Sequence, residues 1–241
     1  MFKITICPTY DEVSAEAFKI MQEVMRKERP VLGLATGSTP LGLYKEMIRD
    51  HQENGTSYHN TVTFNLDEYV GLPKEHAQSY YTFMHENLFN HLDCPEENIH
   101  IPEGDRADEN QACIDYENLL KQYTVDIQVL GIGSDGHIAF NEPGTSFTSE
   151  THLMTLTEQT RRDNARFFDH DIRQVPTTAI TQGLASIMRA DKILLIATGA
   201  NKAEAVYGML KGPVTQACPA SILQKHANVY VFLDKEAAAK L

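Results

Sequence analysis

The sequence has few cysteines, no long apolar run and a shortage of basic side chains. Its four cysteines, Cys7, Cys94, Cys113 and Cys218, lie far apart and form no C-x-x-C pair. This spacing predicts reduced structural thiols and excludes a disulfide framework or a cysteine-based zinc site. No apolar stretch approaches the ~20 residues of a membrane-spanning helix, and the first residues lack the apolar core of a signal peptide. We therefore expect a cytoplasmic protein.

The shortage of basic side chains restricts the possible partners. Lysine and arginine together number 21 against 33 acidic residues, so the formal net charge is −12. A sequence-independent nucleic-acid binder needs a basic face, and cationic attachment to a membrane surface needs one as well. No cluster of basic residues appears. We expect no nucleic-acid or membrane partner, and a small molecule as the ligand.

Short β-branched apolar runs alternate with longer helical patterns along the whole chain. Such alternation predicts right-handed βαβ units and a mostly parallel sheet. With no repeat and no flexible linker, residues 1–241 are expected to form a single-domain, doubly wound (Rossmann-like) α/β fold with helices on both faces. Strands are expected at 3–7, 31–35, 61–66, 126–132, 192–198 and 229–233, and helices at 14–27, 41–53, 79–91, 109–122, 177–189 and 202–211.

One segment fits this alternation poorly. Residues 144–176 are polar and rich in Thr, Arg and Asp, with only a weak helical pattern around 158–168. Long connections without regular structure are often lids over active sites, although an ordinary surface excursion is an equal alternative. We expect a lid within 144–181.

The most informative run is Gly-Ile-Gly-Ser-Asp-Gly-His-Ile-Ala-Phe-Asn-Glu-Pro at 131–143. It places Asp135, His137 and Glu142 just after an apolar strand, at the edge where α/β proteins bind ligands. One carboxylate can fix the tautomer of the imidazole and the other can tune its basicity. A purely structural histidine is the alternative. The spacing matches no usual zinc motif and no second histidine is near, so the run predicts acid–base catalysis without a metal.

A second motif, Leu-Ala-Thr-Gly-Ser-Thr-Pro at 34–40, joins a strand to a helix. The small residues allow close approach of a ligand, and exposed N–H groups, hydroxyls and a helix N-terminus favour an anion. Its spacing matches neither the Walker A nor the G-x-G-x-x-G pattern, so nucleotide binding is unsupported. Simple helix capping by Ser or Thr remains open. The candidate phosphate-binding residues are Thr36, Gly37, Ser38 and Thr39.

Two further sets of charges complete the candidate site. Asp67 and Glu68 follow a strand, so Asp67 can be a catalytic base, or else a turn former or helix cap. Arg166, in the lid-like segment, and Lys202, after another strand, can complete an anion site, or else be solvated charges.

Together these motifs closely resemble the glucosamine-6-phosphate deaminase family, over essentially the whole chain. The resemblance implies conversion of glucosamine 6-phosphate and water into fructose 6-phosphate and ammonia, without a cofactor. It implies that His137 assists opening of the sugar ring, that Asp135 and Glu142 orient it, and that Asp67 takes the C2 proton. The substrate phosphate would rest on residues 36–39, Arg166 and Lys202.

The sequence departs from the hexameric, allosterically activated members of that family. His152 and Met154 stand where those members carry a basic pair for the phosphate of the activator N-acetylglucosamine 6-phosphate, and the chain stops at Leu241 without their C-terminal extension. We expect a short form with little or no activation by that ligand, with a monomer favoured and a homo-oligomer still open. Whether Glu68 touches substrate is undecided.

Two other functions compete with the deaminase. The 6-phosphogluconolactonases share a similar Asp-Gly-His turn, but lactone hydrolysis would leave the Asp67 motif unexplained. A non-catalytic sugar-phosphate sensor would have no use for a full set of acid–base residues, and such sensors usually follow a helix-turn-helix segment. Consumption of the ligand separates an enzyme from a sensor.

Overall fold

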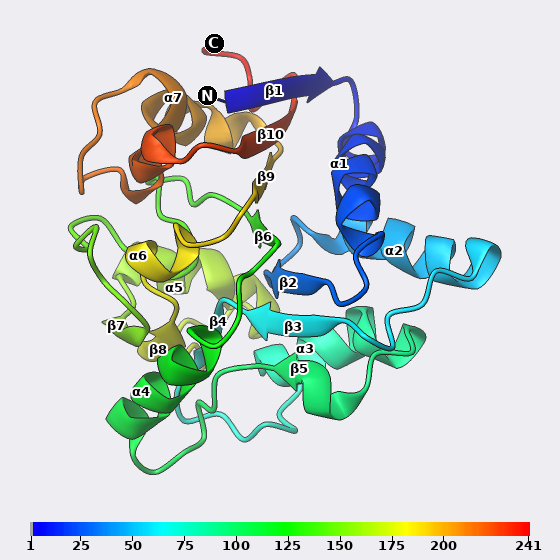
Figure 1. Ribbon diagram of the computed structural model, residues 1–241. Coiled ribbons are helices and arrows are strands. Elements are labelled where there is room, and N and C mark those ends of the chain that lie inside the picture. The colour runs from blue at the N-terminus through cyan, green and yellow to red at the C-terminus, as the bar shows by residue number, and fades with distance from the viewer. Residues whose placement is uncertain (1) are drawn as a thin grey trace.

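The computed structural model describes residues 2–241 and contains a seven-stranded, wholly parallel sheet. The strand order is β1-β10-β9-β6-β2-β3-β5, which confirms the predicted doubly wound, mostly parallel α/β fold (Figure 1). All six predicted strands are present within a few residues of their expected ends. The strands are β1 (Phe2–Cys7), β2 (Val31–Leu34), β3 (Val62–Asn65), β5 (Ile99–His100), β6 (Ile127–Leu130), β9 (Ile193–Ala197) and β10 (Val229–Asp234).

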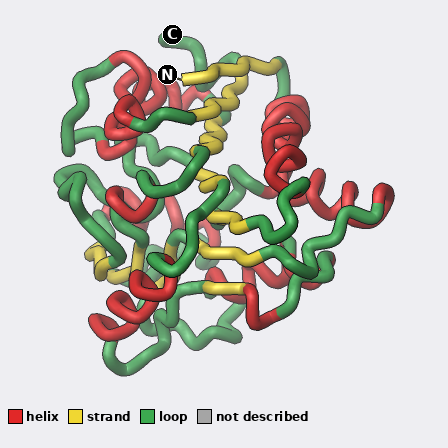
Figure 2. The backbone as a smooth tube through the Cα atoms, viewed as in Figure 1, coloured by secondary structure: helices red, strands yellow, loops and turns green. Residues whose placement is uncertain are grey.

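Helices lie on both sides of the strand ladder (Figure 2). Helices α1 and α2 pack against each other on one side, at the right of Figure 1, and α7 lies on the other. Every residue of β2, β6 and β9 is buried, as expected for central parallel strands covered on both faces. The helices are α1 (Tyr10–Met25), α2 (Leu41–Asn54), α3 (Tyr80–Asn87), α4 (Glu109–Leu120), α5 (Glu158–Asn164), α6 (Leu184–Ile187) and α7 (Ala203–Lys211).

Two helix boundaries differ from the sequence prediction for local reasons. Helix α1 begins four residues before the expected start because the Thr9 side chain accepts a hydrogen bond from the Glu12 N–H, at 3.2 Å, and caps the helix there. Helix α3 ends at Asn87 because Leu88 leaves the helical region, at φ −145°, and a short 3-10 helix, Phe89–His91, follows.

The sheet reverses its winding direction between β2 and β6. From β2 the chain moves outward through β3 to β5, then returns to β6 beside β2 and moves the other way through β9 to β10. Such a switch point opens a crevice at the carboxyl ends of the strands, where ligands of α/β proteins bind. The two glycine-rich motifs both follow these strands, so the topology brings them together.

A second sheet, absent from the sequence prediction, has three antiparallel strands in the order β4-β8-β7. These are β4 (Asp67–Tyr69), β7 (His152–Thr155) and β8 (Thr178–Thr181). The predicted helix at 177–189 is therefore wrong. Its first half is strand β8, in which β-branched residues pair with both neighbours, and only α6 after Gly183 is helical.

The segment 144–176 has more regular structure than the sequence suggested. It contains β7, α5 and a 3-10 helix, Ala165–Phe167. The weak helical pattern at 158–168 is confirmed by α5, which the Thr157 side chain caps by accepting from the Thr160 N–H, at 3.2 Å. A lid function for this segment stays a prediction. None of the helices in residues 2–241 combines the length and apolarity that crossing a bilayer requires.

Candidate active site

A cavity of about 200 Å³ lies at the switch point. Its lining comes from the loops after β2 and β6, from β4 and the start of α3, and from α5 with the following 3-10 turn. The predicted residues on its surface are Thr36, Gly37, Ser38, Thr39, Asp67, His137, Arg166 and Lys202.

The loop after β2 keeps its hydroxyls free of helix capping. The N-cap of α2 is Pro40, and no side chain caps that helix, so capping by Ser38 or Thr39 is wrong as an explanation of the motif. Gly37 adopts φ +87°, a conformation that favours glycine. The Tyr10 hydroxyl lies 3.0 Å from the Ser38 carbonyl oxygen and 2.9 Å from that of Thr39. The loop is thus anchored through its backbone, and none of its side chains is used to cap α2.

Two cations lie beside this loop. A terminal nitrogen of Arg166 is 3.5 Å from Ser38 Oγ, which joins the 3-10 turn after α5 to the loop after β2. Partial burial, together with the nearby Arg166 charge, lowers the pKa of Lys202. Two positive groups placed close together, one of them partly desolvated, form an arrangement that a phosphate dianion would stabilise.

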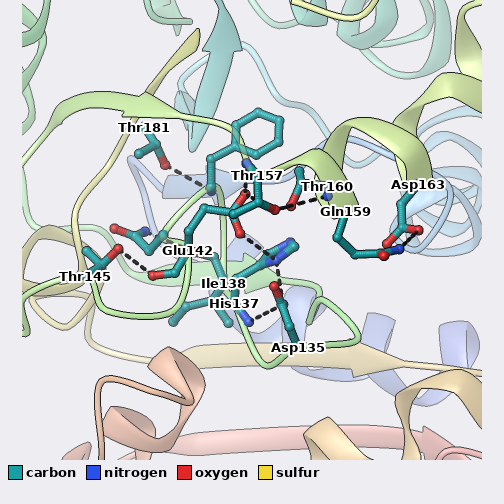
Figure 3. Close-up of polar contacts among 12 residues, drawn as sticks. Asp135, His137, Ile138, Glu142, Thr145, Thr157, Gln159, Thr160, Asp163 and Thr181 are labelled. Atoms are coloured by element: carbon teal, nitrogen blue, oxygen red, sulfur yellow. Dashed lines mark hydrogen bonds and ion pairs between the residues drawn. The ribbon is translucent and has the colours of Figure 1, made fainter. Parts of the chain in front are cut away.

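The imidazole of His137 lies between two carboxylates (Figure 3). Its Nδ1 is 2.7 Å from Asp135 Oδ1 and 3.8 Å from Glu142 Oε2. Although burial alone would raise the pKa of Asp135, its hydrogen bond to His137 and the His137 charge lower that pKa below its usual value. Nδ1 is buried and has no hydrogen bond of good geometry, and Asp135 Oδ1 lies 2.7 Å from it. A proton on Nδ1 would face the two acids and leave Nε2 to the cavity that His137 lines.

The surroundings of His137 fix its ring in place. A Cβ on Gly133 would lie 2.4 Å from ring atoms of His137, so only glycine leaves room for the imidazole there. Glu142 is 4% exposed, and its Oε1 accepts from the backbone N–H of Thr157 at 3.1 Å. Thr157 is the N-cap of α5, so the Glu142 carboxylate is hydrogen-bonded to the start of a helix that lines the cavity.

Asp67 faces the same cavity from β4. Asp67 is 6% exposed. Burial, and after it the charge of Glu68, raises the pKa of the Asp67 carboxyl to about 8. A carboxylate with a pKa near the working pH accepts protons far better than an ordinary one. The backbone of Asp67 pairs with Thr181 of β8, which fixes the side chain relative to the second sheet.

Several residues of the cavity were not foreseen from the sequence. Tyr80 and Gln78 reach it from the start of α3 and the loop before it, and Asp163 reaches it from α5. Tyr80 stacks on Phe140, with ring centroids 6.0 Å apart and planes 11° apart. The only sequence feature near them that predicted structure was Ser79, which caps the start of α3. Glu68, left undecided by the sequence, does not line this cavity.

Asp135, His137 and Glu142 are also the group most suited to a metal ion among residues 2–241. One ligand atom from each of Asp135, His137 and Glu142 lies within 4.8 Å of the others. The 2.7 Å contact between His137 and Asp135 is a hydrogen-bond distance, whereas two ligands of a tetrahedral zinc stand roughly 3.4 Å apart for bonds of ~2.1 Å. The geometry suits a proton relay better, and the absence of a metal stays a prediction.

Comparison with known proteins identifies relatives along nearly the whole chain. The model of the glucosamine-6-phosphate isomerase/6-phosphogluconolactonase family matches residues 9–232. A glucosamine-6-phosphate deaminase of Halalkalibacterium halodurans is 48% identical over 241 residues, which cover 99% of this chain and 98% of the relative.

Solved structures agree with this family. A monomeric glucosamine-6-phosphate deaminase superposes with a TM-score of 0.97 at 45% identity, covering 99% of this chain and all of the other. A 6-phosphogluconolactonase of Trypanosoma brucei has a TM-score of 0.82 at 23% identity, covering 100% of this chain and 99% of the other, and shares the fold alone. The predicted resemblance is confirmed: this chain belongs to the glucosamine-6-phosphate isomerase/6-phosphogluconolactonase family.

Proposed function

We propose that this chain converts D-glucosamine 6-phosphate and water into D-fructose 6-phosphate and ammonia, in the breakdown of amino sugars. The observation that carries the proposal is that Asp67 and His137 line one cavity together with the Ser38–Arg166 contact. A base, a proton relay and an anion site in one cavity are what an aldose–ketose isomerisation of a sugar phosphate requires. The deaminase relatives, at 48% and 45% identity, favour this reaction over lactone hydrolysis.

The first step is ring opening. His137, through Nε2, transfers the proton between the anomeric hydroxyl and the ring oxygen, while Asp135 and Glu142 hold the imidazole and stabilise its charged form. Such proton transfer is typically worth ~10²–10⁴-fold in rate. The C1 hydroxyl loses its proton, the C1–O5 bond breaks, and O5 gains a proton, which leaves an aldehyde at C1.

Asp67 then removes the C2 proton, which the neighbouring aldehyde makes acidic. The electron pair of the C–H bond forms the C1–C2 double bond of an enolamine, and O1 takes a proton. Reprotonation at C1 converts the enolamine into a C2 imine. Water adds to C2 and ammonia leaves, which gives fructose 6-phosphate. No electron acceptor is required, so the proposal includes no cofactor.

The phosphate supplies binding energy away from the reacting carbons. In the proposal it contacts the hydroxyls and N–H groups of residues 36–39 and the cations of Arg166 and Lys202. Energy of this kind holds C2 against the base. Because Arg166 follows α5 and Glu142 contacts Thr157 at its start, we include in the proposal a lid that closes when the phosphate binds.

We further propose a cytoplasmic monomer with little response to N-acetylglucosamine 6-phosphate, consistent with the monomeric relative. His152 and Met154 lie in β7, and His152 Nδ1 is 2.7 Å from the Glu150 carbonyl oxygen. This strand therefore offers no pair of cations to a second sugar phosphate. A sigmoidal rate curve that the activator makes hyperbolic would contradict this part of the proposal.

The experiment is a paired assay of ammonia and fructose 6-phosphate released from glucosamine 6-phosphate. The deaminase predicts equal amounts of the two products. Hydrolysis of 6-phosphogluconolactone without ammonia release would establish the lactonase instead. Binding of glucosamine 6-phosphate without its consumption would establish a sensor.

A further inference from the structure

Asp67 and Glu68 are neighbours in β4, yet they face two different cavities. Asp67 lines the active site, whereas Glu68 lines a second cavity of about 480 Å³ on the other side of the strand. Glu68 is 4% exposed. A carboxylate is expensive to bury unless several donors satisfy it, so its partners show what holds it there.

Both oxygens of Glu68 accept backbone N–H groups. Oε1 accepts from Tyr69 at 2.8 Å and from Tyr80 at 2.9 Å, and Oε2 accepts from Tyr81 at 2.9 Å. Tyr80 and Tyr81 are the first two residues of α3, where N–H groups have no partner within the helix. The negative charge also suits the positive end of the helix dipole. Glu68 therefore fastens the start of α3 to β4.

This connection joins two parts of the active-site wall. β4 carries Asp67, and α3 carries Tyr80, which also lines the cavity and whose ring centroid is 4.8 Å from that of Tyr69. Without Glu68, the start of α3 would lose its two backbone hydrogen bonds to the strand that carries the base. Among residues 2–241, no other carboxylate side chain accepts a hydrogen bond from the α3 backbone.

The charge of Glu68 also raises the pKa of Asp67. Four tyrosines face Asp67 as well, from α2 (Tyr44), β4 (Tyr69), α3 (Tyr80) and α4 (Tyr116). Burial raises the pKa of each tyrosine well above its usual value. All four stay neutral in any ordinary assay. His137 shares the cavity on the other side.

The neighbours of Glu68 are themselves charged. Asp105 faces it across the second cavity, which Lys74, Glu96, Glu103 and Asp115 also line. Burial raises the pKa of Glu68 to about 7, although the three N–H groups oppose that rise. Glu68 is therefore largely ionised above about pH 7, in the range where Asp67, with a pKa of about 8, must act as a base.

We propose that Glu68 is a positioning residue of the reaction: it holds the Asp67 strand against the Tyr80 wall through its three backbone hydrogen bonds and places a negative charge beside the base. It touches no substrate. The inference rests on the proposed function, because it assumes that Asp67 is the base.

The test compares Glu68→Gln and Glu68→Asp with wild type. Gln removes the charge and turns an amide N–H₂ toward N–H donors, so we expect kcat to fall about 10–100-fold, as for small misplacements of a catalytic group. KM should change little, because the phosphate site is separate. Loss of the neighbouring charge should also move the rising limb of the kcat–pH profile to lower pH. Asp keeps the charge but is shorter, so it should lower kcat and leave the limb near its wild-type position.

Glu96→Gln is the matched control. Glu96 lines the same second cavity and accepts from the Tyr81 hydroxyl at 2.9 Å, but it binds neither the α3 backbone nor β4. It should leave kcat and the limb unchanged. If Glu68→Gln lowers only the melting temperature, with kcat and the limb as in wild type, the role is structural and the inference is wrong.

A readout independent of turnover separates this inference from the proposed function. The Asp67 carboxyl can be titrated by ¹³C NMR in wild type, Glu68→Gln and Glu68→Asp, with Asp67→Asn used to assign the signal. The inference predicts a lower pKa in the Gln variant than in the Asp variant, even if wild type released no ammonia. Equal values in the three proteins would overturn it. Absence of ammonia release with the predicted shift would contradict the function alone.

Discussion

His137 Nδ1 lies 2.7 Å from Oδ1 of Asp135, in a turn where both residues follow β6 within seven positions of the strand end. In the proposed mechanism the carboxylate holds the proton on Nδ1, so that Nε2 can exchange protons with a ligand in the cavity. The same contact would stabilise the imidazolium formed when Nε2 takes a proton.

Replacing Asp135 by Asn should disable this relay. The Asn amide can donate to Nδ1 and so favour the opposite tautomer, which leaves a proton on Nε2. We expect kcat to fall on the order of 10²–10⁴-fold, the usual worth of a positioned acid–base group, with little change in KM. Asp115→Asn, on the exposed surface of α4, should leave kcat unchanged. A wild-type kcat in Asp135→Asn would contradict the relay.

The pH profile should show the ionisation of Asp67. As a base it must be deprotonated, and its pKa is raised to about 8 by burial and by the charge of Glu68. The value of kcat/KM should therefore rise with pH through about 8 and fall roughly tenfold per unit below it. Rates are measured from pH 6 to 9.5, with the substrate titrated separately to account for its own ionisations. A flat profile across this range would contradict the assignment.

Asp67→Asn should make the protein more stable at high pH. The folded-state pKa of Asp67 lies above the ~3.9 of an unfolded chain, so its favourable contribution is complete below pH 4. That contribution is lost as pH rises toward 8. Removing the buried charge should raise the free energy of unfolding at pH 9 by on the order of 2–5 kcal/mol, and by much less at pH 5. Urea unfolding at the two pH values checks this, and equal stability at pH 9 would count against it.

Arg166→Ala should weaken binding of the phosphate more than it slows the chemistry. A charged hydrogen bond contributes ~1.5–3 kcal/mol, so KM for glucosamine 6-phosphate should rise about 10–100-fold. The rate with glucosamine, which lacks the phosphate, should not change. Arg162→Ala is the control, because Arg162 pairs with exposed Glu158 in α5. Equal losses with both substrates would show that Arg166 has another role.

How far the sequence predicts the structure depends on the range of the interactions. Asp135, His137 and Glu142 lie within eight residues of one another, so their grouping follows from local chain geometry and could be read directly. Six of the seven strands of the main sheet follow short apolar runs and lie close to their predicted positions, whereas the two-residue strand β5 was not predicted. That the motifs at 34–40 and 131–143 lie close together followed from the rule that parallel strands present their carboxyl ends at one edge of the sheet.

The missed features depend on distant contacts. Strand β8 has helix-like apolar spacing, and only its pairing with β4 and β7 makes it a strand. Tyr80 lines the cavity from the start of α3, where its backbone binds Glu68, twelve positions earlier in the chain. Nothing in the Asp67–Glu68 dipeptide indicates which carboxylate faces the substrate until β4 is placed in its sheet. Asp163 likewise reaches the cavity only through the packing of α5.

The most direct test of the account is release of ammonia and fructose 6-phosphate by wild type and Asp67→Asn, side by side, with substrate carrying hydrogen or deuterium at C2. The account predicts equal amounts of both products from wild type, a slower rate with deuterium, and collapse of the rate in the variant by about 10²–10⁴-fold. Full activity in Asp67→Asn would contradict the central claim that this carboxylate removes the C2 proton.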